Sequence, residues 1–174
     1  IPTMKNHAKL IIAQMNKNLP RVMGNSFVHL RDVDIIVEED RPIPTLPGAE
    51  ITDVERKIGE YCASLVNDGD TLQLGIGGIP DAVVTFLKDK KDLGLHTEMA
   101  ADGIVDLIKA GIINNKKKTL HPGKCIATFA AGSQRLYDFL DDNPNFELHG
   151  VDYVNDPNVI AMNDNMVSIN SCIQ

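Results

Sequence analysis

The pattern of apolar and polar positions changes near residue 50. Beyond that point, short apolar runs alternate with segments whose apolar residues recur every three or four positions. The runs predict strands and the periodic segments predict helices. We expect strands at 71–76, 93–98, 124–131 and 149–154, and helices from residue 52, through 81–90, over 103–111 and over 134–142. This alternation predicts an α/β fold, an open parallel sheet with crossover helices.

The first of these helices has a clear start signal. Thr52 is followed three residues later by Glu55, which is the pattern of a capping box. Apolar residues then repeat on one face of the helix: Val54, Ile58, Tyr61, Cys62 and Leu65.

The amino-terminal part of the chain has a different character. Residues 4–16 fit either a helical turn or two or a strand, and the pattern does not decide between them. Residues 27–38 carry strand signals. Three prolines in the stretch RPIPTLPG predict a linker at residues 41–50. We therefore expect residues 1–40 to belong to a different domain from residues 51–174.

Composition and charge narrow the functional classes. The chain has 174 residues, of which 43% are hydrophobic and 24% charged, as in ordinary globular proteins. A net charge of −7, spread along the chain, argues against nucleic acid as the main partner. A local basic run, Lys116 to Lys118, is expected to be a solvated loop. No apolar run approaches the roughly 18 residues of a membrane span, so we expect no membrane partner.

Cysteine and histidine spacing bears on the compartment and on metals. The three cysteines, Cys62, Cys125 and Cys172, lack CxxC or metal-type spacing and suit reduced thiols in a cytoplasmic protein. The first residues, IPTMKNHAKL, lack the apolar core of a signal peptide, which agrees with that compartment. The five histidines are scattered and show no HExxH pattern, so we expect no metal site.

The stretch LQLGIGGIP, residues 72–80, predicts a tight loop after a strand. Gly75, Gly77 and Gly78 allow the backbone to bend sharply or to approach a ligand closely. In a parallel βαβ unit, the carboxyl ends of consecutive strands lie on the same edge of the sheet. This loop and the segment from His96 to Glu98 should therefore face one crevice.

The spacing leaves two interpretations of the loop open. Gly75 and Gly77 match the first half of a GxGxxG dinucleotide motif, and Glu98 lies about 20 residues further on, where a ribose-binding acid belongs. Pro80, however, stands where the third glycine should permit close packing of the helix. The other interpretation is a tight strand-to-helix turn beside a surface glutamate.

Longer stretches resemble a known family. DTLQLGIGGIPDAVV, LGLHTEMAADGIVDLIKAGIINN, KTLHPGK and VDYVNDPNVIAMNDNMVSINS are similar to segments of the acetyl-CoA hydrolase/transferase family, most of all its 4-hydroxybutyrate and butyrate:acetate CoA-transferases. NLPRVMGNSFVHLRDVDIIVEED resembles the end of that family's first domain, and the family favours a strand for KLIIAQMN. The resemblance covers essentially the whole chain but less than half of a family member.

The resemblance implies two related α/β domains. Residues 1–40 would end the first, residues 41–50 would link the two, and residues 51–174 would form the first half of the second, catalytic domain. The chain starts at Ile1 and stops inside the apolar run MVSINSCI, so we expect a fragment of a longer protein. The family's later glycine-rich loop and most of its CoA-contacting half would lie beyond Gln174, which implies an incomplete active site in this chain alone.

The resemblance also implies a covalent mechanism with Glu98 as the nucleophile. The carboxylate would attack an acyl-CoA thioester to give a mixed anhydride and CoA thiolate. The thiolate would then attack the glutamyl carbonyl, leaving an enzyme–CoA thioester that a second carboxylic acid converts to a new acyl-CoA. Coenzyme A is a substrate in this scheme, and no cofactor is expected.

The other site residues would support that chemistry. Gly77 and Gly78, with Gly75 in the same loop, could offer unobstructed backbone N–H groups to a tetrahedral oxyanion. Gln73 would be a polar neighbour, although a sheet-face role is nearly as good an interpretation. His96 shares a strand face with Glu98, where it could orient the carboxylate or serve as a structural histidine.

Two other functions stay open at this point. Water could replace the acceptor acid, which would make the protein an acyl-CoA hydrolase. Alternatively, the loop could belong to a non-catalytic module that binds a nucleotide or phosphate. For the favoured interpretation the partners are acyl-CoA, short-chain carboxylates, further copies of the chain in a homo-oligomer, and the remainder of the full-length protein.

Overall fold

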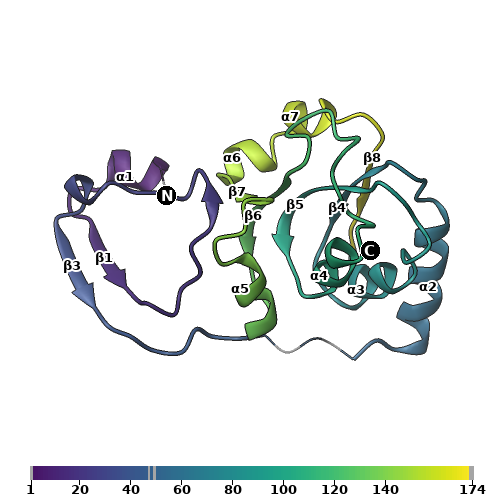
Figure 1. The fold of residues 1–174 in the computed structure, drawn as a ribbon, viewed down its shortest axis with the longest axis horizontal. Helices are drawn as coiled ribbons and strands as arrows, with labels where there is room; N and C mark the ends of the chain where they lie inside the picture. Colours follow the sequence, from purple (N-terminus) through teal and green to yellow (C-terminus); the bar gives the residue numbers. More distant parts are fainter. Residues whose placement is uncertain (1, 47, 49, 173–174) are drawn as a thin grey trace.

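The computed structural model describes residues 2–46, 48 and 50–172, and it confirms the α/β fold class (Figure 1). Six strands form one parallel sheet in the order β2-β7-β6-β5-β4-β8. Their bounds are β2 (Met23–Gly24), β4 (Thr71–Leu74), β5 (Gly94–Ala100), β6 (Cys125–Ala130), β7 (Phe146–Leu148) and β8 (Met166–Ile169). The strands β1 (Ile12–Met15) and β3 (Ile35–Glu38) pair in parallel as a separate sheet.

Helices cover both faces of the large sheet. Their bounds are α2 (Asp53–Ser64), α3 (Gly78–Thr85), α4 (Gly103–Lys109), α5 (Gln134–Leu140), α6 (Val151–Val154) and α7 (Pro157–Ala161). Apolar side chains of α3, α4 and α5 form one core with strand residues such as Leu95 and Ala127. Helix α6 packs on the opposite face, where the carbonyl of Val154 contacts His96 (Figure 1). This division follows from the strand itself, because successive side chains point to opposite faces.

The strand predicted at 149–154 is wrong. Strand β7 ends at Leu148, and the backbone then turns at Gly150, the N-cap of helix α6. The N–H groups of Val154 and Tyr153 both donate to the carbonyl of Gly150. Val151 and Tyr153 alternate as in a strand, whereas Val151 and Val154 are spaced as in one turn of helix. The short apolar run therefore did not distinguish between the two.

The amino-terminal predictions are met only in part. Residues 4–16 contain both of the elements that the pattern left open, since α1 (Pro2–His7) precedes strand β1. The strand predicted over 27–38 is confined to β3, and a 3₁₀ turn, η1 (Leu30–Asp32), interrupts the stretch before it. The ring nitrogen Nδ1 of His29 accepts a hydrogen bond from the N–H of Arg31, which caps that turn and ends the extended conformation.

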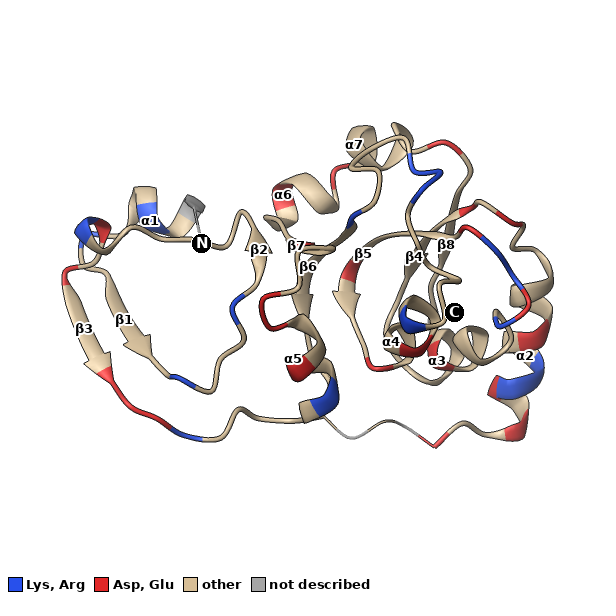
Figure 2. Ribbon diagram, viewed as in Figure 1, with Lys and Arg blue, Asp and Glu red and all other residues tan. Residues whose placement is uncertain are grey.

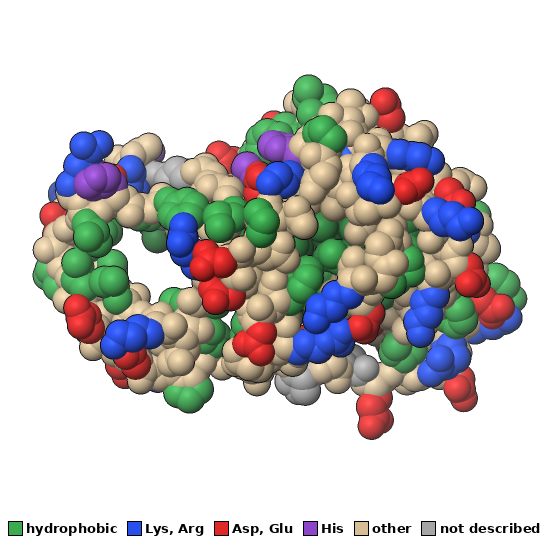
Figure 3. All heavy atoms as spheres, viewed as in Figure 1, with side chains coloured by type: hydrophobic (Ala, Val, Ile, Leu, Met, Phe, Trp, Pro, Cys, Tyr) green, Lys and Arg blue, Asp and Glu red, His purple; other side chains and the backbone are tan. Residues whose placement is uncertain are grey.

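The two-stranded sheet leaves its apolar side chains uncovered. Ile12, Ile35, Ile36 and Val37 are each more than 40% exposed. Figure 3 shows an opening through the molecule beside this sheet, bordered in part by hydrophobic side chains. Strand β2 departs from this arrangement because it pairs with β7 at the edge of the large sheet. The assignment of residues 1–40 to a separate domain stays a prediction.

Acidic and basic side chains are mixed along the chain rather than grouped by sign. Figure 2 shows acidic and basic residues interspersed along the ribbon, including both signs on helix α2. Among the described residues, no helix combines the length and apolar character needed to cross a bilayer.

Helix α2 begins as predicted but buries a different face. The capping box is present, with Thr52 and Glu55 bonded reciprocally. The apolar face predicted from the sequence is largely exposed, since Val54, Tyr61 and Leu65 are each more than 60% accessible. The buried residues of the helix are instead the small ones, Gly59 and Ala63. Small side chains bring α2 close to α3, and this contact decides how the helix is oriented.

We predict that Gly59→Val destabilises the protein by about 1–3 kcal/mol, the usual cost of overpacking. A Cβ atom at Gly59 would lie 2.7 Å from the Cβ of Ala82 and 2.9 Å from the backbone nitrogen of Val83, so helix α3 would have to shift. Urea unfolding measures the change. Glu60→Val, at the next and exposed position, is the control and should cost less than about 1 kcal/mol. Equal losses in the two variants would show that close packing of the helices is not the cause.

The basic run at 116–118 is not wholly a solvated loop. Lys116 and Lys117 are exposed as expected, but Lys118 is only 5% exposed. Its Nζ donates to the carbonyls of Leu95 and Lys124, at 2.8 Å each. This ammonium group ties the loop before β6 to strand β5. Burial lowers the pKa of Lys118 from 10.5 to about 8.

We predict a pH-dependent contribution of Lys118 to stability. Between about pH 8 and about pH 10 the unfolded chain keeps the Lys118 proton that the folded chain has lost, so stability from this group rises with pH. Lys118→Met lacks this gain. The loss of unfolding free energy in that variant should therefore grow with pH in this window, by at most about 1.4 kcal/mol per unit. Urea unfolding at several pH values tests this, with Lys116→Met as control. A difference that does not change with pH would contradict the prediction.

Candidate active site

The path of the chain through the sheet reverses at β4. From β4 the chain moves outward in one direction through β5, β6 and β7, and it then returns to place β8 on the other side of β4. Ligands of open α/β sheets bind at such switch points, outside the carboxyl ends of the strands. The ends of β4, β5 and β8 are therefore the expected site.

Strands β4 and β5 separate before they end. Backbone pairing joins them only at Thr71 with Gly94 and at Leu72 with Leu95. Beyond that point the hydroxyl of Thr97 spans the widening gap, since it donates to the carbonyl of Leu74 (2.8 Å) and accepts from its N–H (3.2 Å). A hydroxyl thus satisfies the backbone of β4 that β5 no longer reaches, and the space beyond it stays open.

A cleft of about 230 Å³ occupies this space. It is lined by residues from these three strand ends and from β6: Gln73, Leu74, Gly75, Ile76, Glu98, Met99, Phe129, Asn170 and Ser171. The structure thus brings Gln73, Gly75 and Glu98 together. Glu98 is exposed, and no described residue forms a hydrogen bond or ion pair with its carboxylate. An unpaired carboxylate in an open cleft has lone pairs free to attack a ligand.

An amide pair forms one wall of the cleft. Asn170 Nδ2 donates to Gln73 Oε1 at 2.7 Å, and Gln73 Nε2 donates to Asn170 Oδ1 at 3.2 Å. Each side-chain amide keeps one further N–H after these bonds. Gly75 makes room for the pair, because a Cβ at this position would lie 2.7 Å from Asn170 Oδ1.

The other predicted glycines, Gly77 and Gly78, do not line the cleft that holds Glu98. Gly77 adopts a φ of 111°, which glycine tolerates best, and caps helix α3 without lining the Glu98 cleft. Gly78 lies in the first turn of α3, where a Cβ would collide with the carboxylate of Glu55. The N–H of Gly75 already donates to the carbonyl of Ile169 at 2.8 Å. Among the described residues, no hydrogen bond engages the N–H of Ile76, which lines the cleft.

His96 does not reach the cleft. It is fully buried beneath α6, where Nε2 lies 2.9 Å from the carbonyl of Val154 and Nδ1 lies 3.5 Å from the amide of Asn163. Burial lowers the pKa of His96, with the charge of Lys118 adding to that effect. The uncharged ring therefore positions strand β5 from the opposite end of the same face, which is the structural role that the sequence also allowed.

A second, more apolar groove of about 450 Å³ adjoins the cleft. Ile76 and Met99 line both spaces. The groove contains Asp81, whose pKa is raised by burial and then by the charges of Asp102 and Glu55. Two adjoining spaces that share these lining residues, one polar and one apolar, suit a ligand with a reactive polar end and a longer apolar part.

Sequence reasoning missed the contributions of β6 and β8. Asn170, Ser171 and Phe129 line the cleft but were not singled out as site residues. The signal was present, since NS directly follows the strand run MVSI and so falls at a strand's carboxyl end. Finding it required knowing that β8 lies beside β4, which the order of elements along the chain does not reveal.

Comparisons with known proteins show which proteins this chain resembles. Residues 132–174 match the family model of the acetyl-CoA hydrolase/transferase C-terminal domain. The 4-hydroxybutyrate coenzyme A transferase of Clostridium kluyveri is 61% identical over 167 residues, which cover 96% of this chain and 39% of that protein. The succinyl-CoA:acetate/propanoyl-CoA:succinate CoA transferase of Fasciola hepatica is 43% identical over 169 residues, covering 97% of this chain and 35% of that protein. The chain thus spans less than half the length of these relatives.

Solved structures give the same result at the level of the fold. The 4-hydroxybutyrate CoA-transferase of Porphyromonas gingivalis superposes with a TM-score of 0.92 at 50% identity, covering 98% of this chain and 44% of that one. RipA from Yersinia pestis superposes with a TM-score of 0.92 at 43% identity, covering 96% of this chain and 39% of that one. Sequence and fold together confirm the resemblance of this chain to the acetyl-CoA hydrolase/transferase family.

Proposed function

We propose that this chain carries the nucleophile of a CoA-transferase, which exchanges CoA between an acyl-CoA and a short-chain carboxylic acid. The observation that carries the proposal is the unpaired Glu98 carboxylate, exposed in a cleft at the switch point of the sheet. The names of the related proteins support the reaction class and suggest 4-hydroxybutyrate, butyrate or acetate as the acid.

The reaction would proceed through a glutamyl-CoA thioester. A Glu98 oxygen attacks the thioester carbon of acyl-CoA, and the C–S bond breaks to release CoA thiolate and leave a mixed anhydride. The thiolate attacks the glutamyl carbonyl carbon, and the first acid departs as its carboxylate. The acceptor carboxylate then attacks the glutamyl thioester, which forms a second anhydride and releases CoA thiolate. The thiolate attacks the acyl carbon of that anhydride, which forms the new acyl-CoA and frees the Glu98 carboxylate.

The cleft wall supplies donors for the oxyanions that these steps create. The remaining amide N–H groups of Gln73 and Asn170 border the cleft that holds Glu98, and so does the unengaged N–H of Ile76. Fixed donors of this kind stabilise a tetrahedral oxyanion without having to reorganise. In this proposal, the N–H of Ile76 takes the backbone role expected of Gly77 and Gly78, because neither of those glycines lines the cleft and the N–H of Gly75 already donates to Ile169.

The adjoining apolar groove would hold part of the acyl-CoA. Ile76 and Met99 connect it to the reactive cleft, so a chain entering through the groove could present its thioester to Glu98. A carboxylate is a weak nucleophile, and binding energy from the distant part of CoA is needed to reach the transition state. The rest of the full-length protein would provide most of those contacts.

Hydrolysis of acyl-CoA is the second candidate, and the exposure of Glu98 favours it. Water that reaches the anhydride or the thioester would release both products as free acid and CoA. The two functions differ in one measurement, because a transferase forms new acyl-CoA from an added acid and a hydrolase does not.

The free thiols of Cys62, Cys125 and Cys172 suit the cytoplasm, which we propose as the compartment.

Glu98→Gln should abolish CoA transfer in the full-length protein, because the variant lacks the attacking oxygen anion. Glu98→Asp should lower turnover by roughly 100-fold, since the carboxylate is withdrawn by about an ångström. Incubation of the wild-type protein with acyl-CoA alone should leave CoA on Glu98, and borohydride reduction followed by peptide mapping should locate it.

Glu60→Gln, an exposed glutamate on α2, is the matched control and should transfer at the wild-type rate. Normal transfer by a folded Glu98→Gln variant would refute Glu98 as the nucleophile.

Asn170→Ala and Gln73→Leu should each lower turnover by about 100-fold, the scale of losing one oxyanion donor. The effect should fall on kcat, because the donors act on charge that exists only in the transition state. Steady-state kinetics of the full-length protein measures it, with Asn158→Ala on the exposed surface of α7 as the control. A folded Asn170→Ala variant with an unchanged kcat would leave the amide pair a purely structural role.

A further inference from the structure

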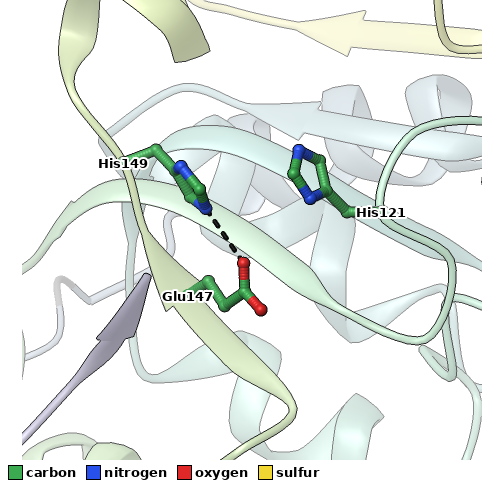
Figure 4. A group of neighbouring side chains, drawn as sticks. All are labelled: His121, Glu147 and His149. Atoms are coloured by element: carbon green, nitrogen blue, oxygen red, sulfur yellow. Dashed lines mark hydrogen bonds and ion pairs between the residues drawn. The ribbon is translucent and has the colours of Figure 1, made fainter. Parts of the chain in front are cut away.

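The fold brings His121 close to Glu147 and His149, which lie 26 and 28 residues further along the chain. The potential ligand atoms of His121, Glu147 and His149 all lie within 4.8 Å of one another. Figure 4 shows Glu147 and His149 on one stretch of chain, with His121 facing them from another. His121 comes from the loop before β6, Glu147 from β7, and His149 from the turn that leads into α6.

Neighbouring groups hold this cluster in place. The hydroxyl of Tyr153 lies 2.8 Å from Nε2 of His121, which leaves Nδ1 of that ring as the available nitrogen. Nε2 of His149 lies 3.0 Å from Glu147 Oε2, and the backbone N–H of His149 donates to the carbonyl of Ala127. The rings of His121 and His149 are 5.2 Å apart between centroids, and all three side chains of the cluster are half-buried.

The backbone at His121 is also unusual. Its φ of 49° lies in the left-handed region, which few residues other than glycine adopt. Strain of this kind persists where the surrounding structure fixes it. Here it turns the His121 ring towards β7.

We propose that His121, Glu147 and His149 form a binding site for one divalent transition-metal ion, with Zn²⁺ as the best match. Two imidazoles and a carboxylate are the donor set that Zn²⁺ accepts, and the fourth position would fall to solvent. Tetrahedral bonds of about 2.0–2.1 Å bring ligand atoms to about 3.4 Å from each other, so small side-chain movements complete the site. This site was not expected from the sequence, in which the five histidines lie far apart.

Metal binding would replace the hydrogen bond between His149 and Glu147. In a neutral His149 ring, the proton that Nε2 donates to Glu147 Oε2 moves through solvent to Nδ1, and the ion takes its place between the two atoms. Tyr153 acts as the outer partner that fixes the tautomer and orientation of His121, a common device at metal-binding histidines.

Nearby positive charge determines which ions suit the site. Lys124 Nζ lies 3.7 Å from Glu147 Oε1, and it must share this carboxylate with the ion. A cation held mainly by charge, such as Mg²⁺ or Ca²⁺, is therefore disfavoured. An ion that forms strong bonds to imidazole nitrogen is favoured.

The metal would fasten α6 to the sheet. Its three ligands join the loop before β6, strand β7 and the start of α6. Helix α6 in turn contributes the carbonyl of Val154 that contacts His96, two residues before Glu98 on the same strand face. The metal site would thus stabilise helix α6, which packs on the strand that carries Glu98, and none of its ligands lines the Glu98 cleft.

The direct test is titration of the purified, metal-free, full-length protein with Zn²⁺ and with Co²⁺. We expect one ion per chain and, with Co²⁺, the visible absorption of a tetrahedral site. His149→Gln and Glu147→Gln should weaken binding by at least roughly 100-fold, and Tyr153→Phe by roughly 10-fold, as for the loss of an outer partner. His29→Gln is the matched control and should bind like the wild type. Absence of stoichiometric binding, or unchanged affinity in the ligand variants, would overturn the proposal.

A second test measures hydrogen exchange in the wild-type protein, so its outcome does not depend on whether a variant folds. Zn²⁺ added to the wild-type protein should slow hydrogen exchange at the amides of Tyr153, Val154 and Asn155, whose hydrogen bonds form α6. Mg²⁺ at the same concentration should not. Protection that is absent from α6, or equal for the two ions, would count against the site.

Discussion

The separation of β4 from β5 is the constraint on which the site depends. Parallel pairing between the two strands stops at Leu72 and Leu95. If it continued, backbone hydrogen bonds would close the space that Glu98 borders. The hydroxyl of Thr97 satisfies both backbone groups of Leu74 instead, so the strands can part without leaving a buried donor or acceptor unpaired. A single side-chain oxygen therefore keeps the carboxyl ends of two strands open to a ligand.

Much of this site could be predicted from local patterns. The alternation of strands and helices indicated a parallel sheet, and the shared edge of consecutive strands placed Gly75 and Glu98 in one crevice. The remainder depended on contacts between segments distant in the chain. The return of β8 to the far side of β4 brought in Asn170. Lys118 was expected in a solvated loop, but it is buried and its ammonium group donates a hydrogen bond to the carbonyl of Leu95.

The failed predictions have related physical causes. The strand expected at 149–154 was a turn of helix, because one turn of apolar residues is too short for its period to be recognised. The apolar stripe of α2 is exposed because Gly59 and Ala63 allow a closer approach to α3 from another side. Periodicity shows that a helix is amphipathic, but the packing of the smallest residues can decide which face is buried.

The exposed apolar surfaces fit a chain that spans less than half the length of its relatives. The side chains of β1 and β3 have little cover among the described residues, and neither has the stripe of α2 that includes Val54 and Leu65. Large apolar side chains left in water mark surfaces that other structure covers. We expect the remainder of the full-length protein to cover them, which would also enclose the cleft beside Glu98 and limit its access to water.

The amide pair has a consequence for how this sequence can change over time. Gln73 and Asn170 are 97 positions apart, and each side chain satisfies the other. Gly75 is held to glycine by the same Asn170, since any larger side chain would meet its carbonyl oxygen. A replacement at one of the three positions therefore alters which residues the other two can accept. In relatives that have lost one of them, we expect the others to have changed as well, so that these positions vary as a group.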